Sequence, residues 1–363
     1  MKNTTNVSNE GLLSLTNPFH SLFDNKCFKR SFYCDIINSL FVRGIVMELV
    51  LWILLGVIVV ILPCFFMLRY TMKISRDLFL DLLVRTEKTK WSRECSAPEI
   101  EEHYGMYKDG VEWACTVMSN MRELTVENDG LKLYGEYYDF GYDKAVIIIP
   151  GRNEGLRYSY YFAMPYPKAG YNVLVIDIRA HGNSEGKYDT LGWDEKGDMI
   201  KWIELLSENG VKKVILHGLC IGAATSIYTA AAENCPKELS ALILEGPYTS
   251  FYDVLKQRMK TQKKPVFPVR NELRYIIKKN YGYDIKKQSP LNFADKVKIP
   301  TLFICGRRDV SSVPEKCEIL YKSIGSQKKK LVWFSRGAHS HLRVNNLPYY
   351  DREIIDFLGS CGI

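Results

Sequence analysis

One stretch of the chain, His217–Ala224, has the residue types and spacing of a reactive turn. It reads His-Gly-Leu-Cys-Ile-Gly-Ala-Ala, so Gly218 and Gly222 each lie two residues from Cys220. This is the spacing of the G-x-S-x-G turn, in which a strained central residue holds a nucleophile above a sheet. The neighbours of such a residue must lack bulk. The stretch therefore predicts a thiol nucleophile, although a lone cysteine in an apolar run is more often a small buried side chain.

A nucleophilic thiol needs a base and a group that orients the base. Asp309 and His339 each follow a short apolar run, so both are expected beyond the carboxyl ends of strands, where open parallel sheets place ligands. Two alternatives are His341 for His339 and Glu245 for Asp309. Together these residue types predict acyl transfer, in which sulfur attacks a carbonyl carbon and histidine moves the proton.

The sequence predicts that a parallel sheet positions these residues. Eight short apolar runs alternate with helix-length segments, and continuous Val/Ile/Leu strands of this kind are covered by helices on both faces. The first two runs flank Asn128-Asp129-Gly130, a strong hairpin signal. The runs are 122–127, 131–138, 144–149, 171–177, 213–217, 241–245, 301–305 and 330–334.

The interval 249–297 is longer than the other connections. It is rich in Lys, Tyr and Phe, and three prolines break it. We interpret it as a small helical insertion over the strand ends, where a substrate lid would lie. An irregular connector is the alternative.

An uncharged apolar segment lies near the beginning of the chain. Residues 49–68 contain no charged side chain, and at ~1.5 Å per residue a helix of this length crosses a ~30 Å hydrocarbon core. We expect one transmembrane helix at 45–68, between an N-terminal tail of 1–44 and a helical connector of 69–120. The sheet domain then covers 121–363. Lys and Arg are more numerous after the span than before it, which favours a cytoplasmic location for that domain.

Composition limits the other function classes. The net charge is +8, but no basic patch is interleaved with aromatic residues, so no nucleic-acid partner is expected. The ten cysteines include no C-x-x-C pair, and no Cys/His cluster has metal-ligand spacing, so no metal or other cofactor is predicted. So many free thiols indicate a reducing compartment, or an organism that tolerates free thiols outside the cell.

Several motifs in series resemble those of the α/β hydrolases, over roughly two-thirds of the chain. The resemblance is closest to bacterial membrane-anchored hydrolases of the serine aminopeptidase-like kind. It implies a mostly parallel eight-stranded sheet with helices on both faces and a small helical insertion, here preceded by the transmembrane helix. The matching stretches are Asp129–Leu133, Asp177–Ser184 (D-x-R-x-H-G-x-S), His217–Ala224 (H-G-x-S-M-G-A-A with Cys for Ser), Glu245–Ser250 and Pro300–Asp309.

The resemblance also implies roles for the candidate residues. Cys220 takes the place of the nucleophilic serine, as the cysteine of dienelactone hydrolases does. The order nucleophile, acid, histidine is that of the family. Alignment with the family favours His339 over His341, and Asp309 is preferred to Glu245, although some α/β hydrolases have their acid at the position of Glu245. The implied site is a Cys-His-Asp triad.

The oxyanion loop departs from the family pattern. Where the family has His-Gly after the third strand, this chain has Pro150-Gly151-Arg152. The backbone N–H groups of Arg152 and Ile221 would hold the oxyanion. The Arg152 side chain either binds an anionic substrate group or points to solvent. His181 lies in a loop that is structural in the family, and His217 supports the nucleophile turn.

The resulting hypothesis is a membrane-anchored hydrolase that cleaves ester, thioester or small amide or peptide bonds through an acyl-enzyme. Its partners would be the acyl substrate and the lipid bilayer. Two alternatives stay open. One is an acyltransferase, in which an alcohol or amine replaces water. The other is a catalytically inactive binding protein, for which the cysteine and the changed oxyanion loop would be the signs.

Overall fold

A computed structural model describes residues 21–363, with side chains from residue 29 onward. Residues 1–20, which make up the first part of the predicted tail, lie outside the described residues. The chain divides into two compact units, residues 1–69 and 70–363. Each unit is described by itself.

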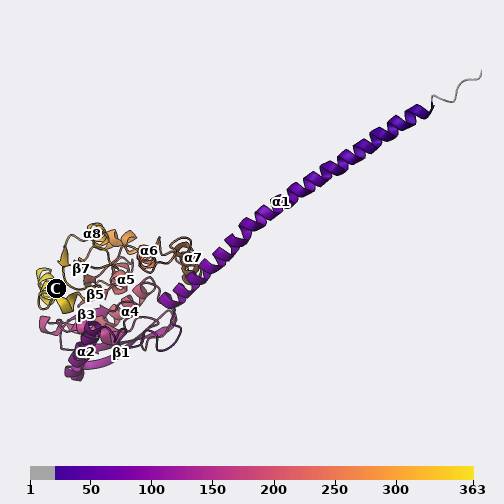
Figure 1. Ribbon diagram of the computed structural model, residues 1–363. Coiled ribbons are helices and arrows are strands. Elements are labelled where there is room, and N and C mark those ends of the chain that lie inside the picture. The colour runs from indigo at the N-terminus through magenta and orange to yellow at the C-terminus, as the bar shows by residue number, and fades with distance from the viewer. Residues whose placement is uncertain (1–20) are drawn as a thin grey trace, which may run out of the picture. The chain divides into compact units, whose positions relative to one another are not determined.

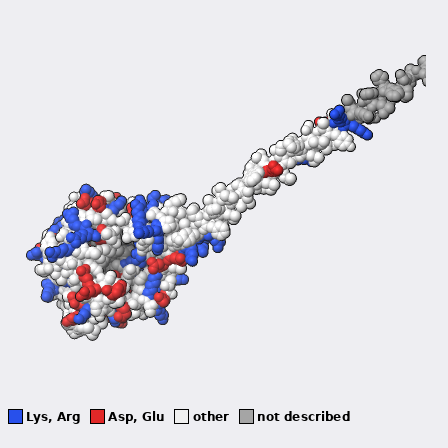
Figure 2. All heavy atoms as spheres, in the orientation of Figure 1, with Lys and Arg blue, Asp and Glu red and all other residues white. Residues whose placement is uncertain are grey.

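The first unit contains most of one long helix, α1 (Ser21–Leu83) (Figure 1). In Figure 2 this helix is white over most of its length, because its middle part carries few charged side chains. It is long and apolar enough to cross a membrane, which is consistent with single-pass anchoring. The helix extends beyond both ends of the predicted span 45–68 and includes Pro63, a residue that membrane helices tolerate.

The second unit is built on one eight-stranded sheet, which confirms the predicted sheet. The strand order is β1-β2-β4-β3-β5-β6-β7-β8; β2 pairs antiparallel with β1 and β4, and every other pair is parallel. The predicted hairpin is also confirmed, because Asn128 pairs with Leu131 and positive φ angles at Asp129 and Gly130 make a two-residue turn. The strands are β1 (Met121–Asn128), β2 (Leu131–Tyr138), β3 (Lys144–Ile149), β4 (Asn172–Ile176), β5 (Lys213–Leu219), β6 (Leu239–Glu245), β7 (Thr301–Gly306) and β8 (Lys329–Phe334).

Helices cover both faces of this sheet (Figure 1). Alternate strand residues point to opposite faces, so Ile148 packs with the helices of one face and Ile147 with those of the other. The first face carries α2 (Glu101–Thr116), α3 (Leu156–Ala163) and α10 (Tyr349–Ser360), and the second carries α4 (Glu195–Glu208), α5 (Ile221–Ala230) and α8 (Pro314–Ser323).

The interval 249–297 contains two helices, α6 (Phe251–Thr261) and α7 (Val269–Tyr281). Their apolar sides pack against the last turns of α1, where Leu82 and Leu83 are buried. The interval therefore forms a small helical layer with a core of its own. The short helix α9 (Leu342–Asn345) follows β8.

Three aromatic residues of the connector differ in packing. Trp91 is buried and stacks on the His181 ring at 4.5 Å, and Trp113 packs against Tyr138. Tyr104 is exposed, because it lies on the solvent side of α2.

Candidate active site

The candidate nucleophile lies on a strained turn between β5 and α5. Cys220 has φ 54° and ψ −103°, a conformation that side chains rarely adopt. A Cβ atom on Gly218 would lie 2.2 Å from the Gly222 backbone, and one on Gly222 would lie 2.3 Å from the carbonyl oxygen of Ile149. Both glycines are therefore needed for the turn to close against β3.

His339 and Asp309 meet beyond the carboxyl ends of β8 and β7. His339 Nδ1 lies 2.7 Å from Asp309 Oδ2. Asp309 Oδ1 accepts backbone N–H bonds from Ser311 at 2.8 Å and Ser312 at 2.7 Å, which fix the carboxylate. A Cβ atom on Gly246 would lie 2.9 Å from the His339 ring, so glycine leaves the room that the imidazole occupies.

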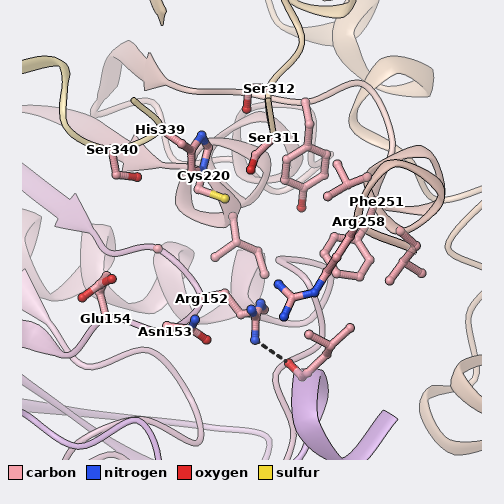
Figure 3. A pocket seen from close by; sticks show the side chains of 16 residues that line it. Arg152, Asn153, Glu154, Cys220, Phe251, Arg258, Ser311, Ser312, His339 and Ser340 are labelled. Carbon is pink, nitrogen blue, oxygen red and sulfur yellow. Dashed lines mark hydrogen bonds between the residues drawn. The ribbon is translucent and has the colours of Figure 1, made fainter. Parts of the chain in front are cut away.

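The electrostatics of the pair favour its charged form. Burial lowers the pKa of His339, but Cys220 and Asp309 together raise it more, and this pKa lies well above its ordinary value. Burial raises the pKa of Asp309, but the hydrogen bond and charge of His339 outweigh it and hold this pKa below its ordinary value. The His339 ring lies next to the Cys220 thiol (Figure 3), and its buried Nε2 has no hydrogen-bond partner among the described residues. These contacts favour an imidazolium beside the sulfur, held by an ionised carboxylate.

Two backbone N–H groups are available beside the thiol. The Ile221 N–H is at the first position of α5, where no intrahelical acceptor exists. Within residues 21–363 the Arg152 N–H makes no hydrogen bond, while the Arg152 carbonyl lies 2.6 Å from His181 Nε2. A Cβ atom on Gly151 would lie 3.9 Å from that of Cys220, so this loop passes next to the candidate nucleophile.

A cavity of about 220 Å³ lies at Cys220 (Figure 3). Helix α6 supplies much of one wall, and α1 contributes Leu82. Apolar and polar groups are both present, as in ordinary small-molecule sites. The lining residues used below are Arg152, Cys220, Phe251, Val254, Leu255, Arg258 and His339.

The alternative base, His341, belongs to a different cluster. Its Nδ1 lies 2.8 Å from Glu102 Oε1, and its Nε2 lies 3.2 Å from His103 Nδ1. His103 Nε2 in turn lies 3.4 Å from Glu154. The two histidines that the sequence left as alternatives are therefore separated, and His339 is the one placed against Asp309.

The alternative acid, Glu245, is buried in a network behind the turn. It accepts a short hydrogen bond from the Tyr350 hydroxyl, which lies 3.4 Å from His217 Nε2, and the Tyr166 hydroxyl lies 3.0 Å from His217 Nδ1. Burial raises the pKa of Glu245 to about 7 and lowers the pKa of His217 to about 3. Both groups are therefore pushed toward their neutral forms.

His181, another histidine considered from the sequence, is fully buried between loops. Its Nδ1 lies 3.0 Å from the Arg179 carbonyl, opposite the contact with Arg152. Burial lowers the pKa of His181 to about 4. It links the loop after β4 to the loop that carries Arg152. Among the described residues no group of three or more His, Cys, Asp or Glu side chains is arranged to hold a metal ion.

Comparisons with known proteins agree with this architecture. A family model described as alpha/beta hydrolase fold matches residues 144–264, from β3 through the nucleophile turn to α6. An esterase of Pyrococcus furiosus has a similar structure, with a TM-score of 0.55 at 24% identity over 68% of this chain and 93% of that chain. The chain has the α/β-hydrolase fold. An acylaminoacyl peptidase of Pyrococcus horikoshii shares the fold at 18% identity, with a TM-score of 0.51, over 68% of this chain and 43% of that chain.

Two curated proteins are similar in sequence to this chain. YqkD of Bacillus subtilis is 28% identical over 216 residues, which are 59% of this chain and 70% of that protein. Protein bem46 of Schizosaccharomyces pombe is 29% identical over 201 residues, which are 54% of this chain and 61% of that protein. The similarity to bem46 is compatible with the α/β-hydrolase superfamily, which the family model supports.

Arg258 is a charged lining residue that was not singled out from the sequence. Arg258 lies on α6 and faces the cavity from the side opposite Cys220 (Figure 3). The available signal was weak, because an arginine on an amphipathic helix is usually solvated. Its position follows from the packing of α6 against α1, which sequence patterns do not specify.

Proposed function

We propose that this protein is a membrane-anchored α/β hydrolase that cleaves ester, thioester or small amide bonds through an acyl-enzyme on Cys220. The observation that carries the proposal is the 2.7 Å contact of His339 with Asp309, with the imidazole against the thiol of a strained nucleophile turn. The contact between acid and base, and the position of the thiol beside the ring, support the assignment of Cys220 as nucleophile, His339 as base and Asp309 as orienting acid.

In the proposed reaction the Cys220 sulfur, as thiolate, attacks the carbonyl carbon of the substrate. The N–H groups of Ile221 and Arg152 stabilise the oxyanion that forms. His339 gives its proton to the leaving alcohol, thiol or amine as the bond to it breaks, which leaves a thioester on Cys220. His339 then takes a proton from water, the hydroxide attacks the thioester, and the acid leaves while the thiolate and imidazolium are restored.

The anchor is the second part of the proposal. Residues 45–68 would lie in the bilayer, and the Lys and Arg residues that follow the span favour a cytoplasmic location for the catalytic unit. Substrates near a membrane surface would then reach the site. Thiolates attack activated acyl groups readily, so esters and thioesters are expected before amides.

The test is mass spectrometry of the full-length protein in detergent, treated with 4-nitrophenyl esters of increasing chain length. We expect an acyl adduct on Cys220 and release of nitrophenol that disappears in Cys220→Ala. In His339→Ala the adduct should form far more slowly. Cys235→Ala, which removes a half-buried thiol with no acid or base partner, is the matched control and should retain the adduct.

Absence of an adduct in the folded protein, with Cys220 alkylated no faster than Cys235, would contradict the proposal and favour the inactive binding protein. An adduct that forms but leaves only on addition of an alcohol or amine would identify an acyltransferase. Separate product analysis with and without the acceptor distinguishes these results.

A further inference from the structure

The cavity at Cys220 contains two arginine side chains on the side away from His339. Arg152 comes from the loop after β3, and Arg258 comes from α6. Their guanidinium groups lie near each other (Figure 3), and the charge of Arg258 acts on Arg152. Two cations in one small, partly enclosed space repel each other, so the arrangement needs a compensating negative charge.

The protein supplies little of that charge at this place. The nearest carboxylate of Arg258 is Asp81 at 4.0 Å, and both side chains are substantially exposed, so this ion pair is weak. Arg152 makes no ion pair within 4 Å among the described residues. Its Nη1 donates a hydrogen bond to the Leu82 carbonyl at 3.2 Å. The other guanidinium N–H groups of Arg152 have no partner in the described part of the chain.

Asp189 is the carboxylate with the largest electrostatic effect on Arg152, but it carries little negative charge near neutral pH. Asp189 is fully buried, and burial and then Glu195 raise its pKa to about 8. It is therefore largely protonated near neutral pH. Burial, and also the charge of Arg258, lower the pKa of Arg152, but a guanidinium still stays charged.

The cavity's own carboxylate is turned away from the two arginines. Glu154 is held by Ser96 Oγ at 2.9 Å and lies near His103. In Figure 3 it lies on the side away from Arg258. The lining also includes apolar side chains of α6, namely Phe251, Val254 and Leu255. The cavity thus combines a thiol, apolar side chains and two cationic groups.

We propose that Arg152 and Arg258 form an anion-binding subsite, so that the preferred acyl substrates carry a carboxylate or phosphate group separated from the reacting carbonyl by an apolar segment. Guanidinium groups bind both anions through paired N–H donors, which a lysine ammonium does not reproduce. This inference rests on the proposed hydrolase function and specifies its substrate class. It also gives a role to the Arg152 side chain, which departs from the usual sequence of the oxyanion loop.

The test compares two matched esters on the full-length protein, 4-nitrophenyl pentanoate and 4-nitrophenyl hemiglutarate, which differ by a terminal carboxylate. We expect a higher kcat/KM for hemiglutarate. In Arg258→Gln the ratio of the two kcat/KM values should fall about 10- to 100-fold, the range expected for losing a hydrogen bond to a charged group. Lys260→Gln removes an exposed cation from the same helix and should leave this ratio unchanged. An unchanged ratio in Arg258→Gln would overturn the inference.

Binding measurements separate this inference from the hydrolase proposal. Glutarate and inorganic phosphate are titrated by calorimetry into Cys220→Ala, with and without Arg258→Gln and Arg152→Gln. Binding that Arg258→Gln weakens about 10-fold or more supports the subsite even if no ester is turned over, and the preferred anion identifies the substrate group. The subsite would be overturned if neither anion binds and the two esters have the same kcat/KM. The hydrolase proposal would then still stand. Thermal unfolding of each variant shows whether a lost signal reflects lost folding.

Discussion

Two histidines near the nucleophile turn have opposite charge preferences. His339 lies directly against Asp309, and its pKa lies well above the ordinary value despite the lowering effect of burial. His217 has hydroxyl partners, Tyr166 and Tyr350, and burial lowers its pKa to about 3. His217 is fully buried, and the His339 side chain keeps 22% of its surface exposed. The partner therefore decides which histidine holds a proton at neutral pH.

The two carboxylates differ in the same way. Asp309 receives two backbone N–H bonds and the imidazole, which keep it ionised, whereas Glu245 receives one tyrosine hydroxyl and has a pKa near 7. The regions are joined through the backbone, because the Cys220 N–H donates to the Glu245 carbonyl at 2.9 Å. We interpret the charged pair as the reactive part and the neutral network as the support of the turn.

The largest expected effect is on catalysis. His339→Gln should lower kcat/KM for a 4-nitrophenyl ester about 10²- to 10⁴-fold, because general acid–base catalysis is removed. His217→Gln should lower the free energy of unfolding, by about 1–3 kcal/mol for the hydroxyls left unpaired, while kcat/KM falls much less. Ester kinetics and denaturant unfolding on the same preparations check both results.

His341→Gln is the matched control, since this residue is two positions from His339 but pairs with Glu102. A loss of activity in His341→Gln as large as that in His339→Gln would break the assignment of roles. So would a His217→Gln variant that is fully stable but inactive.

The parts of this site that were predictable are those that depend on local backbone geometry. The turn at Cys220 follows from two glycines at fixed spacing, and the strands follow from apolar runs whose alternate residues face opposite helix layers. The pairing of His339 with Asp309 could be predicted because each residue follows a predicted strand. The features of the site that could not be predicted from the sequence depend on packing across the sheet. That His341 turns to Glu102, and that Arg258 lies near Arg152, depends on how α2 and α6 dock, and no short sequence pattern contains that information.

A smaller effect is expected from the pH dependence of stability. The pKa of Glu245 rises from about 4.5 in the unfolded chain to about 7 in the folded protein, so the folded state holds this proton more tightly. The stability associated with the protonated form is fully present below pH 4.5, is lost as the pH rises from 4.5 to 7, and stays absent above 7. Glu245→Gln cannot ionise, so its free energy of unfolding relative to the unsubstituted protein should rise by about 3 kcal/mol between pH 4.5 and 8.

Denaturant unfolding of both proteins across this pH range measures the difference directly, and contributions of other groups largely cancel. Glu233→Gln, an exposed glutamate, is the control and should show little pH dependence. A stability difference that is flat with pH, or one that falls as the pH rises, would mean that Glu245 is ionised in the folded protein. The contrast with Asp309 would then be lost.

The smallest expected effect concerns the Tyr350 hydroxyl, which contacts both Glu245 and His217. Tyr350→Phe leaves Glu245 and His217 without their shared partner and should lower the free energy of unfolding by about 2 kcal/mol. The Tyr350 hydrogen bond lowers the pKa of Glu245, so it favours the ionised carboxylate, and its loss should cost more at pH 8 than at pH 5. In a Glu245→Gln background this pH difference should disappear, and Tyr349→Phe, which alters an exposed neighbour, should show neither effect. An equal loss at both pH values would show that the Tyr350 hydroxyl stabilises the fold independently of the charge state of Glu245. The support of the nucleophile turn would then not depend on whether Glu245 is ionised.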